Sequence, residues 1–182
     1  TNTNDNFERN PFSSRHIVKT DYYFATNGFD LNYKGEFANV FFQKVNFAID
    51  VGYNSPNYAT NFFDFGNETD NPEADEDDGL DVNLDYNRVK IRTFEVLPSL
   101  VWRGYSGSEV SLGLSYESNE VERTEGRFIE TIPEDNELFD QQDFWGVNAS
   151  YNFRNKDRES FPTLGFELSL ETGYKNNVST SK

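Results

Sequence analysis

The chain of 182 residues carries 32 acidic and 16 basic residues, so its formal net charge is −16. This balance excludes a nucleic-acid partner, because phosphate contacts require clustered Lys and Arg. The absence of Cys removes disulfides, thiolate metal sites and cysteine nucleophiles. No apolar run approaches the roughly 18 residues of a membrane helix, whereas a membrane β-barrel needs an apolar residue only at every second strand position.

The first fifteen residues are polar and form an expected irregular N-terminal segment, domain 1–15. No basic-then-apolar leader follows Thr1, so we expect a processed or truncated chain. Residues 176–182 form a polar tail with no closing strand, which we interpret as an interruption. The segment between them, 16–175, is predicted to be an antiparallel β-meander.

The first strands are expected over 16–25, 29–37 and 45–53. Asn27 and Gly28 predict a tight turn between the first two, because both residue types adopt positive φ at low cost. Apolar and polar residues alternate strictly in the second and third strands, as they do when one face of a strand is apolar. His16 is the single His, so a zinc site is excluded and a structural or interfacial role is expected. The neighbouring Ser13 and Ser14 allow a lipase-like alternative, although no nucleophile elbow accompanies them.

A long acidic loop is expected over 54–85. Residues 58–67 are aromatic and could hold a hidden strand, and 68–81 contain eight acids and no base. We interpret this run as a solvated surface loop. The alternative is a loosely bound calcium ion or cation bridges to lipid headgroups, because hard cations take several carboxylate oxygens. The weak metal-ligand candidates are Asp75, Asp77, Asp78 and Asp81.

The pattern changes phase within 86–102. Val89 and Ile91 share one parity, whereas Phe94 and the apolar residues after it share the other, which predicts a bulge near Thr93. Pro98 lacks a ladder donor and indicates a second irregularity or a hidden turn. A Gly/Ser turn over 103–108 then precedes a strand over 110–116.

A second acidic loop is expected over 118–143, with a possible hidden strand at 121–132. Strands over 145–153 and 164–175 follow, and the last alternates for about a dozen residues, enough for the roughly 9–11 that cross a bilayer. The joins after the third and fifth strands are long and acidic, while most others are short. Such a rhythm is typical of outer-membrane barrels, which separate short periplasmic turns from long extracellular loops. We count seven clear strands and allow nine.

One parity of these strands is predicted to face lipid and the other a polar lumen. The lipid-facing candidates are Phe29, Val45, Phe47, Val110, Leu112, Leu168 and Leu170. Charges assigned to the lumen, where we expect them to neutralise one another, are Lys34, Lys90, Arg92, Glu36, Glu117, Glu167 and Glu171. Gly52, Gly113, Gly146 and Gly165 fall on the same polar parity.

Two segments resemble the BamA/TamA-like bacterial surface antigen superfamily. The first is the Lys-Asp-Arg sequence at 156–158 followed by Phe-Pro-Thr-Leu-Gly at 161–165. The second, Asn-Phe-Phe-Asp-Phe-Gly-Asn-Glu-Thr at 61–69, is similar to a segment of Bacteroidota members, although Asp64 departs from the usual Gly. The resemblance implies the N-terminal half of a transmembrane barrel of roughly 16 strands. It also implies a structural turn built by Asp157, Arg158, Pro162 and Gly165.

The resemblance further implies the outer membrane of a Gram-negative bacterium and a role in protein insertion or translocation. The implied partners are lipid and lipopolysaccharide, other barrel strands or outer-membrane proteins, and lipoproteins. No catalytic residue and no cofactor is implied within this segment. Some superfamily members carry a metallophosphoesterase ahead of the barrel, so a membrane-linked phosphoesterase is one alternative. A complete eight-stranded structural or adhesin barrel and a soluble lipocalin-like binding module are the others.

Overall fold

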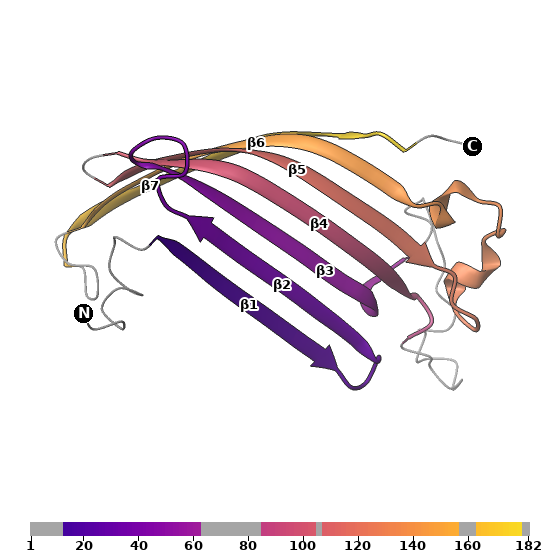
Figure 1. The fold of residues 1–182 in the computed structure, drawn as a ribbon. Coiled ribbons are helices and arrows are strands. Elements are labelled where there is room, and N and C mark those ends of the chain that lie inside the picture. Colours follow the sequence, from indigo (N-terminus) through magenta and orange to yellow (C-terminus); the bar gives the residue numbers. More distant parts are fainter. Residues whose placement is uncertain (1–12, 63–84, 105–106, 157–162, 180–182) are drawn as a thin grey trace.

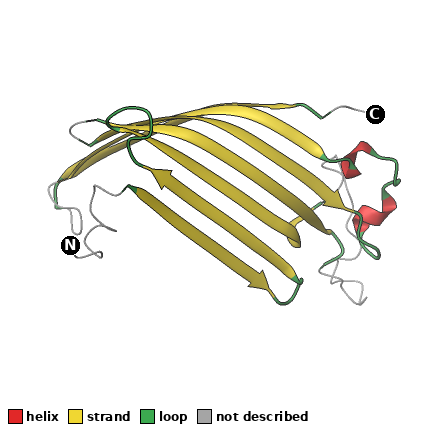
Figure 2. Cartoon of the chain, viewed as in Figure 1, coloured by secondary structure: helices red, strands yellow, loops and turns green. Residues whose placement is uncertain are grey.

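A computed structural model describes residues 13–62, 85–104, 107–156 and 163–179. These residues form one antiparallel sheet whose seven strands lie side by side in chain order (Figure 1). The strands are β1 (Ser14–Tyr23), β2 (Gly28–Phe37), β3 (Val45–Asn61), β4 (Arg88–Arg103), β5 (Ser108–Glu122), β6 (Gln142–Lys156) and β7 (Gly165–Asn177). Two short 3-10 helices, η3 (Phe128–Thr131) and η4 (Glu137–Phe139), lie between β5 and β6 (Figure 2). The predicted antiparallel meander is confirmed, and within the described residues the sheet is not closed into a barrel.

The strand pairing sorts the side chains onto two faces, because directly paired residues point to the same side of a sheet. One line of paired residues crosses β2 to β6 as Phe37, Phe47, Leu100, Leu112 and Ala149. The adjacent line on the other face, from β2 to β7, runs through Glu36, Ala48, Ser99, Gly113, Asn148 and Gly173. The sheet therefore has an apolar face and a polar face that persist across its width.

The two long connections leave the same end of the sheet, which we call the loop end (Figure 1). They join β3 to β4 and β5 to β6, and the short β1–β2 turn lies at this end too. Asn27 has φ 52° in that turn, as its residue type predicts. The β2–β3, β4–β5 and β6–β7 connections lie at the opposite end, the turn end.

Several strands are longer than the sequence pattern predicts. β3 continues to Asn61 and β5 to Glu122, so each takes residues from an expected acidic loop. The hidden strand expected over 121–132 is wrong: its first two residues end β5, and Phe128–Thr131 form η3. In the other expected hidden strand, 58–61 belong to β3 and 63–67 lie outside the described residues.

The predicted bulge near Thr93 is misplaced. β4 pairs with β5 in one constant register, and the irregularities lie instead in β3, between Asn54 and Asn57 and between Tyr58 and Thr60. β4 also runs straight through Pro98, so no hidden turn exists there. The β4–β5 pairing omits Leu97 and Pro98, because proline has no N–H to donate.

Three of the four buried hydrophobic residues of the described chain gather at the loop end, and Val101 lies near the turn end of β4. Val89, Ile129 and Ile132 form a small cluster, and Phe62, Ile91, Val121, Leu138 and Phe139 pack against it. Val89 and Ile91 share the polar-face parity of β4 and lie beneath the η3 segment. The apolar residues of β4 change parity because Val89 and Ile91 pack against a loop on the polar face. The strand β4 itself is regular at this point. We call this group the loop-end cluster.

Candidate functional site: the apolar face of the sheet

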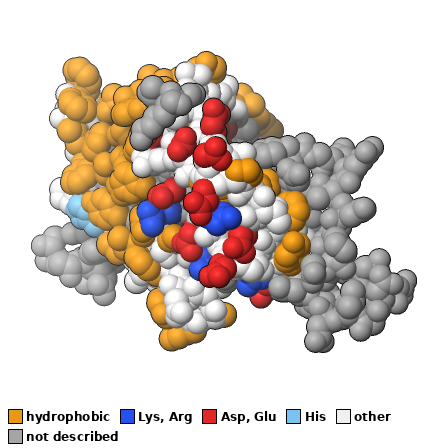
Figure 3. All heavy atoms as spheres, turned by 90° about the vertical axis from the view of Figure 1, so that its right-hand side faces the viewer, with side chains coloured by type: hydrophobic (Ala, Val, Ile, Leu, Met, Phe, Trp, Pro, Cys, Tyr) orange, Lys and Arg blue, Asp and Glu red, His pale blue; other side chains and the backbone are white. Residues whose placement is uncertain are grey.

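All seven predicted lipid-facing residues lie on one face of the sheet. Five of them are exposed, Leu112 with 63% of its surface accessible, while Val45 and Phe47 are half-buried. Figure 3 looks at the loop end, and hydrophobic side chains cover its left edge, which is the side that faces the reader in Figure 1. Side chains normally bury an apolar face against a second layer. No described residue supplies such a layer here.

A row of aromatic side chains borders the apolar face towards the loop end. Its members are Phe29, Tyr53, Phe94, Tyr116, Trp145 and Tyr174, one from each strand from β2 to β7. Ring centroids lie 5.5 Å apart for Phe29 and Tyr53 and 5.1 Å apart for Tyr116 and Trp145. We call it the loop-end aromatic row.

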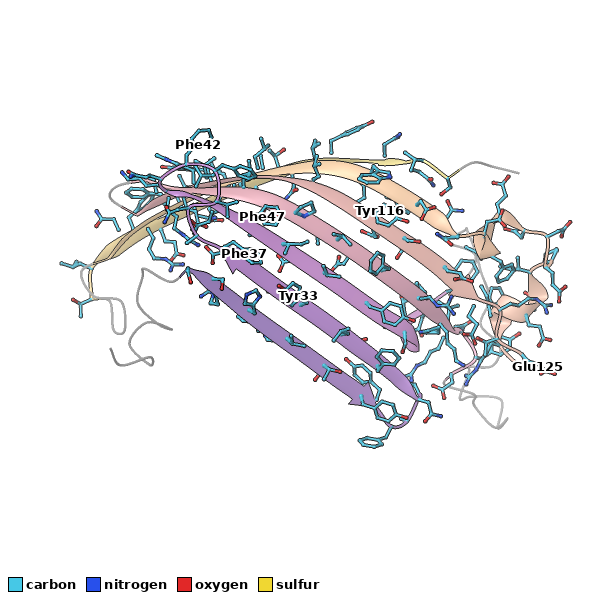
Figure 4. All side chains as sticks on the ribbon, in the orientation of Figure 1. Tyr33, Phe37, Phe42, Phe47, Tyr116 and Glu125 are labelled. Atoms are coloured by element: carbon cyan, nitrogen blue, oxygen red, sulfur yellow. The ribbon has the colours of Figure 1, made fainter. Side chains whose placement is uncertain are left out.

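A second row borders the same face towards the turn end. Its members, from β2, β3, β4, β6 and β7, are Phe37, Phe47, Trp102, Phe153 and Phe166, of which Figure 4 labels the first two. On β2, β4, β6 and β7 the two rows are eight positions apart, which corresponds to about 27 Å along a strand. Aliphatic residues such as Val96, Leu112 and Leu170 fill the band between the rows. We call it the turn-end aromatic row.

The loop-end aromatic row crosses the strands obliquely. Tyr53 pairs directly with Leu31, Tyr116 with Val96, and Tyr174 with Val147. Each of these partners lies two positions nearer the turn end than the aromatic residue of its own strand. From one strand to the next, the row therefore shifts towards the turn end by about one residue on average. With a rise of about 3.3 Å per residue and a strand spacing of about 4.8 Å, this slip corresponds to strands tilted by roughly 35–40°. Transmembrane barrels tilt their strands by about the same angle.

Two ion pairs between β4 and β5 lie on the apolar face, just beyond the loop-end aromatic row. Arg92 lies 2.7 Å from Glu120, and Lys90 lies 3.4 Å from Glu122. The assignment of Lys90 and Arg92 to the polar face is therefore wrong, because they share the parity of Phe94. Their charges lie outside the band between the two aromatic rows.

The polar face carries a network of charged groups centred on Glu36, which is only 7% exposed. Its carboxylate accepts hydrogen bonds from Arg15 at 3.0 Å, from Asn46 at 2.8 Å and from Arg103. Arg103 also donates to Glu109 at 2.8 Å. Sequence reasoning missed Arg103, because an Arg beside a glycine turn gives no sign of the strand that it reaches.

Of the other predicted lumen charges, Lys34, Glu117 and Glu167 form ion pairs between strands, and Glu171 lies on the polar face opposite Ser150. Lys34 lies 3.4 Å from Asp50, and Arg154 lies 2.9 Å from Glu167. Glu117 of β5 pairs with Lys175 of β7, two strands away. Gly52, Gly113, Gly146 and Gly165 all occupy the polar face, as predicted. This arrangement keeps opposite charges together on the face away from the apolar residues.

The remaining candidates are placed in part. Gly165 opens β7, whereas Asp157, Arg158 and Pro162 lie outside the described residues. The four calcium candidates Asp75, Asp77, Asp78 and Asp81 also lie outside them. His16 contacts the Tyr33 hydroxyl at 2.8 Å through Nδ1, and its ring meets Phe37 edge-on. In the described part of the chain, no group of three or more acidic or His residues is arranged to hold a metal.

Comparison with family models, with curated proteins and with solved structures found no match to this chain. The described residues also contain no helix long and apolar enough to span a membrane. The resemblance to the surface antigen superfamily therefore stays a prediction.

Proposed function

We propose that this sheet is the membrane-spanning part of an outer-membrane β-barrel, with its apolar face against acyl chains. The observation that carries the proposal is the exposed aliphatic band held between two aromatic rows. Outer-membrane barrels have such a band, about 25 Å tall and flanked by aromatic girdles. A separation of about 27 Å along strands tilted by roughly 35–40° corresponds to a band about 21 Å tall.

The polar face supports the same orientation. A soluble lipocalin-like module turns its apolar face inward and its charges towards water. Here the ion pairs around Glu36, Glu117 and Glu167 gather on one face, opposite the uncovered apolar residues. In a barrel that face lines a polar interior, where paired charges and backbone-proximal glycines are ordinary. Because a soluble module also separates charged from apolar side chains, the preference for the membrane alternative rests on the aromatic rows that border the exposed band.

The two edge strands of the sheet, β1 and β7, each have one side without a partner strand in the described residues. Within the described residues, β1 pairs only with β2, and β7 pairs only with β6. Unpaired backbone groups at a strand edge are too costly in hydrocarbon, so further strands must cover both edges. We propose that they come from the same polypeptide or from a partner, to complete a barrel of roughly 16 strands.

The biological role rests on the sequence resemblance at 156–165 and 61–69. It supports a role in inserting or translocating outer-membrane proteins in a Gram-negative cell, with lipopolysaccharide and lipoproteins as neighbours. The geometry supports the membrane location more strongly than this role.

The two tryptophans of the chain test the location directly. Trp102 belongs to the turn-end aromatic row, Trp145 to the loop-end aromatic row, and both are exposed on the apolar face. Variants Trp102→Phe and Trp145→Phe leave one tryptophan each, which is excited selectively over the tyrosines. After folding into phosphatidylcholine vesicles, lipids brominated at defined acyl depths should quench both fluorophores, most strongly from shallow positions.

Two outcomes would contradict the proposal. One is a fluorophore that responds to a water-soluble quencher and ignores brominated lipid. The other is protein that stays folded and monodisperse in detergent-free buffer. Urea-unfolded protein mixed with the same vesicles is the control for unspecific adsorption.

A further inference from the structure

The β2–β3 turn presents three consecutive hydrophobic side chains to solvent. Val40 is 47% exposed, Phe41 61% and Phe42 74%. Runs of exposed apolar residues are avoided on protein surfaces unless they contact something. The short turns of outer-membrane barrels on this side have no need of such a run.

Hydrogen bonds hold this turn in one conformation. Asn39 and Lys44 both have positive φ, 55° and 70°, and the Lys44 N–H donates to Asn39 Oδ1 at 2.8 Å. The Val45 N–H donates to the Phe42 carbonyl at 3.1 Å. Because Asn is among the residues that enter the left-handed region most readily, Asn39 suits its position.

The turn is also fixed to the network on the polar face. The Asn39 N–H donates to Asn46 Oδ1 at 3.1 Å, and the Asn46 amide in turn donates to the buried Glu36. The Arg103 N–H of β4 donates to the Lys44 carbonyl at 3.0 Å. These contacts keep the backbone from rearranging to bury the hydrophobic side chains against the sheet.

The position of the turn indicates what its side chains contact. The turn directly connects Phe37 with Val45, and Phe37 and Phe47 belong to the turn-end aromatic row (Figure 4). It therefore continues the apolar face at the level where acyl chains give way to headgroups. Aromatic side chains partition favourably into that layer.

We propose that Val40, Phe41 and Phe42 insert into the lipid leaflet on the turn side and act as an interfacial anchor for this edge of the barrel. The inference rests on the proposed membrane location. It adds a lipid contact outside the strands, supplied by a turn that the polar-face network holds open.

The test places a fluorophore in the turn. A Phe42→Trp variant is made in a Trp102→Phe, Trp145→Phe background and folded into phosphatidylcholine vesicles with brominated acyl chains. Glu125→Trp in the same background is the matched control, because Glu125 lies in the exposed loop at the opposite end (Figure 4). We expect lipid quenching at position 42 and none at position 125.

The single-tryptophan proteins that retain Trp102 or Trp145 separate the possible failures. If both are quenched by lipid while position 42 responds only to a water-soluble quencher, the turn contacts water or a protein and the inference is overturned. If Trp102 and Trp145 also escape lipid quenching, the membrane location itself fails. A Phe41→Ser, Phe42→Ser variant should show reduced vesicle insertion, whereas Gln43→Ser in the same turn should leave insertion unchanged.

Discussion

At the scale of single residues, Glu36 is the most constrained charged group of the polar face. It lies on β2, yet its three donors come from β1, β3 and β4. A carboxylate that is nearly buried needs these partners, because an unpaired charge away from water is strongly destabilising. One side chain thus joins four strands near the turn end.

Replacing Glu36 with Ala should lower the free energy of unfolding by about 1–3 kcal/mol, since Arg103 and Asn46 lose their acceptor. The measurement is urea unfolding of protein folded into detergent micelles. Glu167→Ala removes an exposed ion pair with Arg154 and should cost less than about 1 kcal/mol. Equal effects for the two variants would show that the network around Glu36 contributes nothing special.

Close packing of backbone and side chains leaves no room for a side chain at Gly146 on the polar face. A Cβ on Gly146 would lie 2.6 Å from the Tyr174 carbonyl oxygen and 2.6 Å from Ser115 Oγ. On Gly173, in the neighbouring strand, the nearest atom would be 3.3 Å away. The sequence pattern placed Gly146 on this face but gave no sign of how closely its neighbours pack.

Gly146→Ala should therefore reduce the free energy of unfolding by about 1–3 kcal/mol, because the clash involves backbone that cannot move freely. Gly173→Ala should change it by less than about 1 kcal/mol. Unfolding midpoints in the same micelles compare the two, and a larger loss for Gly173→Ala would contradict the packing described.

At the scale of elements, the loop-end cluster holds the acidic connection between β5 and β6 against the sheet. Ile129 of η3 is only 1% exposed and packs with Val89 of β4. Arg123 reinforces the loop by donating to the Glu130 carbonyl at 2.7 Å. The segment 123–141 therefore packs on the sheet through a small cluster of buried side chains.

Ile129→Ala should loosen this loop and leave the strands between the aromatic rows intact. A cavity in the cluster costs about 2–4 kcal/mol locally. Trypsin should then cleave faster after Arg123 or Arg127, whereas peptides from β4 and β5 stay protected. Unchanged cleavage after those residues would show that the cluster does not order the loop.

The presence of each strand, and the face on which most of its side chains lie, were predictable from sequence because alternation depends only on the residues of one strand. The location of the bulge was not, since an extra residue can be absorbed by either of two paired strands. The irregularities lie in β3, whereas the change of parity in β4 comes from the loop that packs on Val89 and Ile91. The interpretation of 121–132 as a strand failed for a related reason: the apolar residues Ile129 and Ile132 contact Val89 across the loop end.

At the scale of the whole molecule, the apolar face could be predicted residue by residue, whereas its borders could not. The two aromatic rows, their spacing and their oblique course follow from the pairing of strands far apart in sequence. The Glu36 network likewise depends on which strands become neighbours. The described sheet is open, so closure into the proposed barrel would require further strands.

The most direct test of the membrane orientation is a cysteine scan along β7, made possible because the chain contains no Cys. Side chains on both faces of β7 are exposed, so reactivity reports their surroundings more than their packing. In vesicles, a charged maleimide should label Ser169→Cys and Glu171→Cys on the polar face. It should spare Leu168→Cys and Leu170→Cys on the apolar face. Uniform labelling of all four variants, or the reverse pattern, would contradict the account.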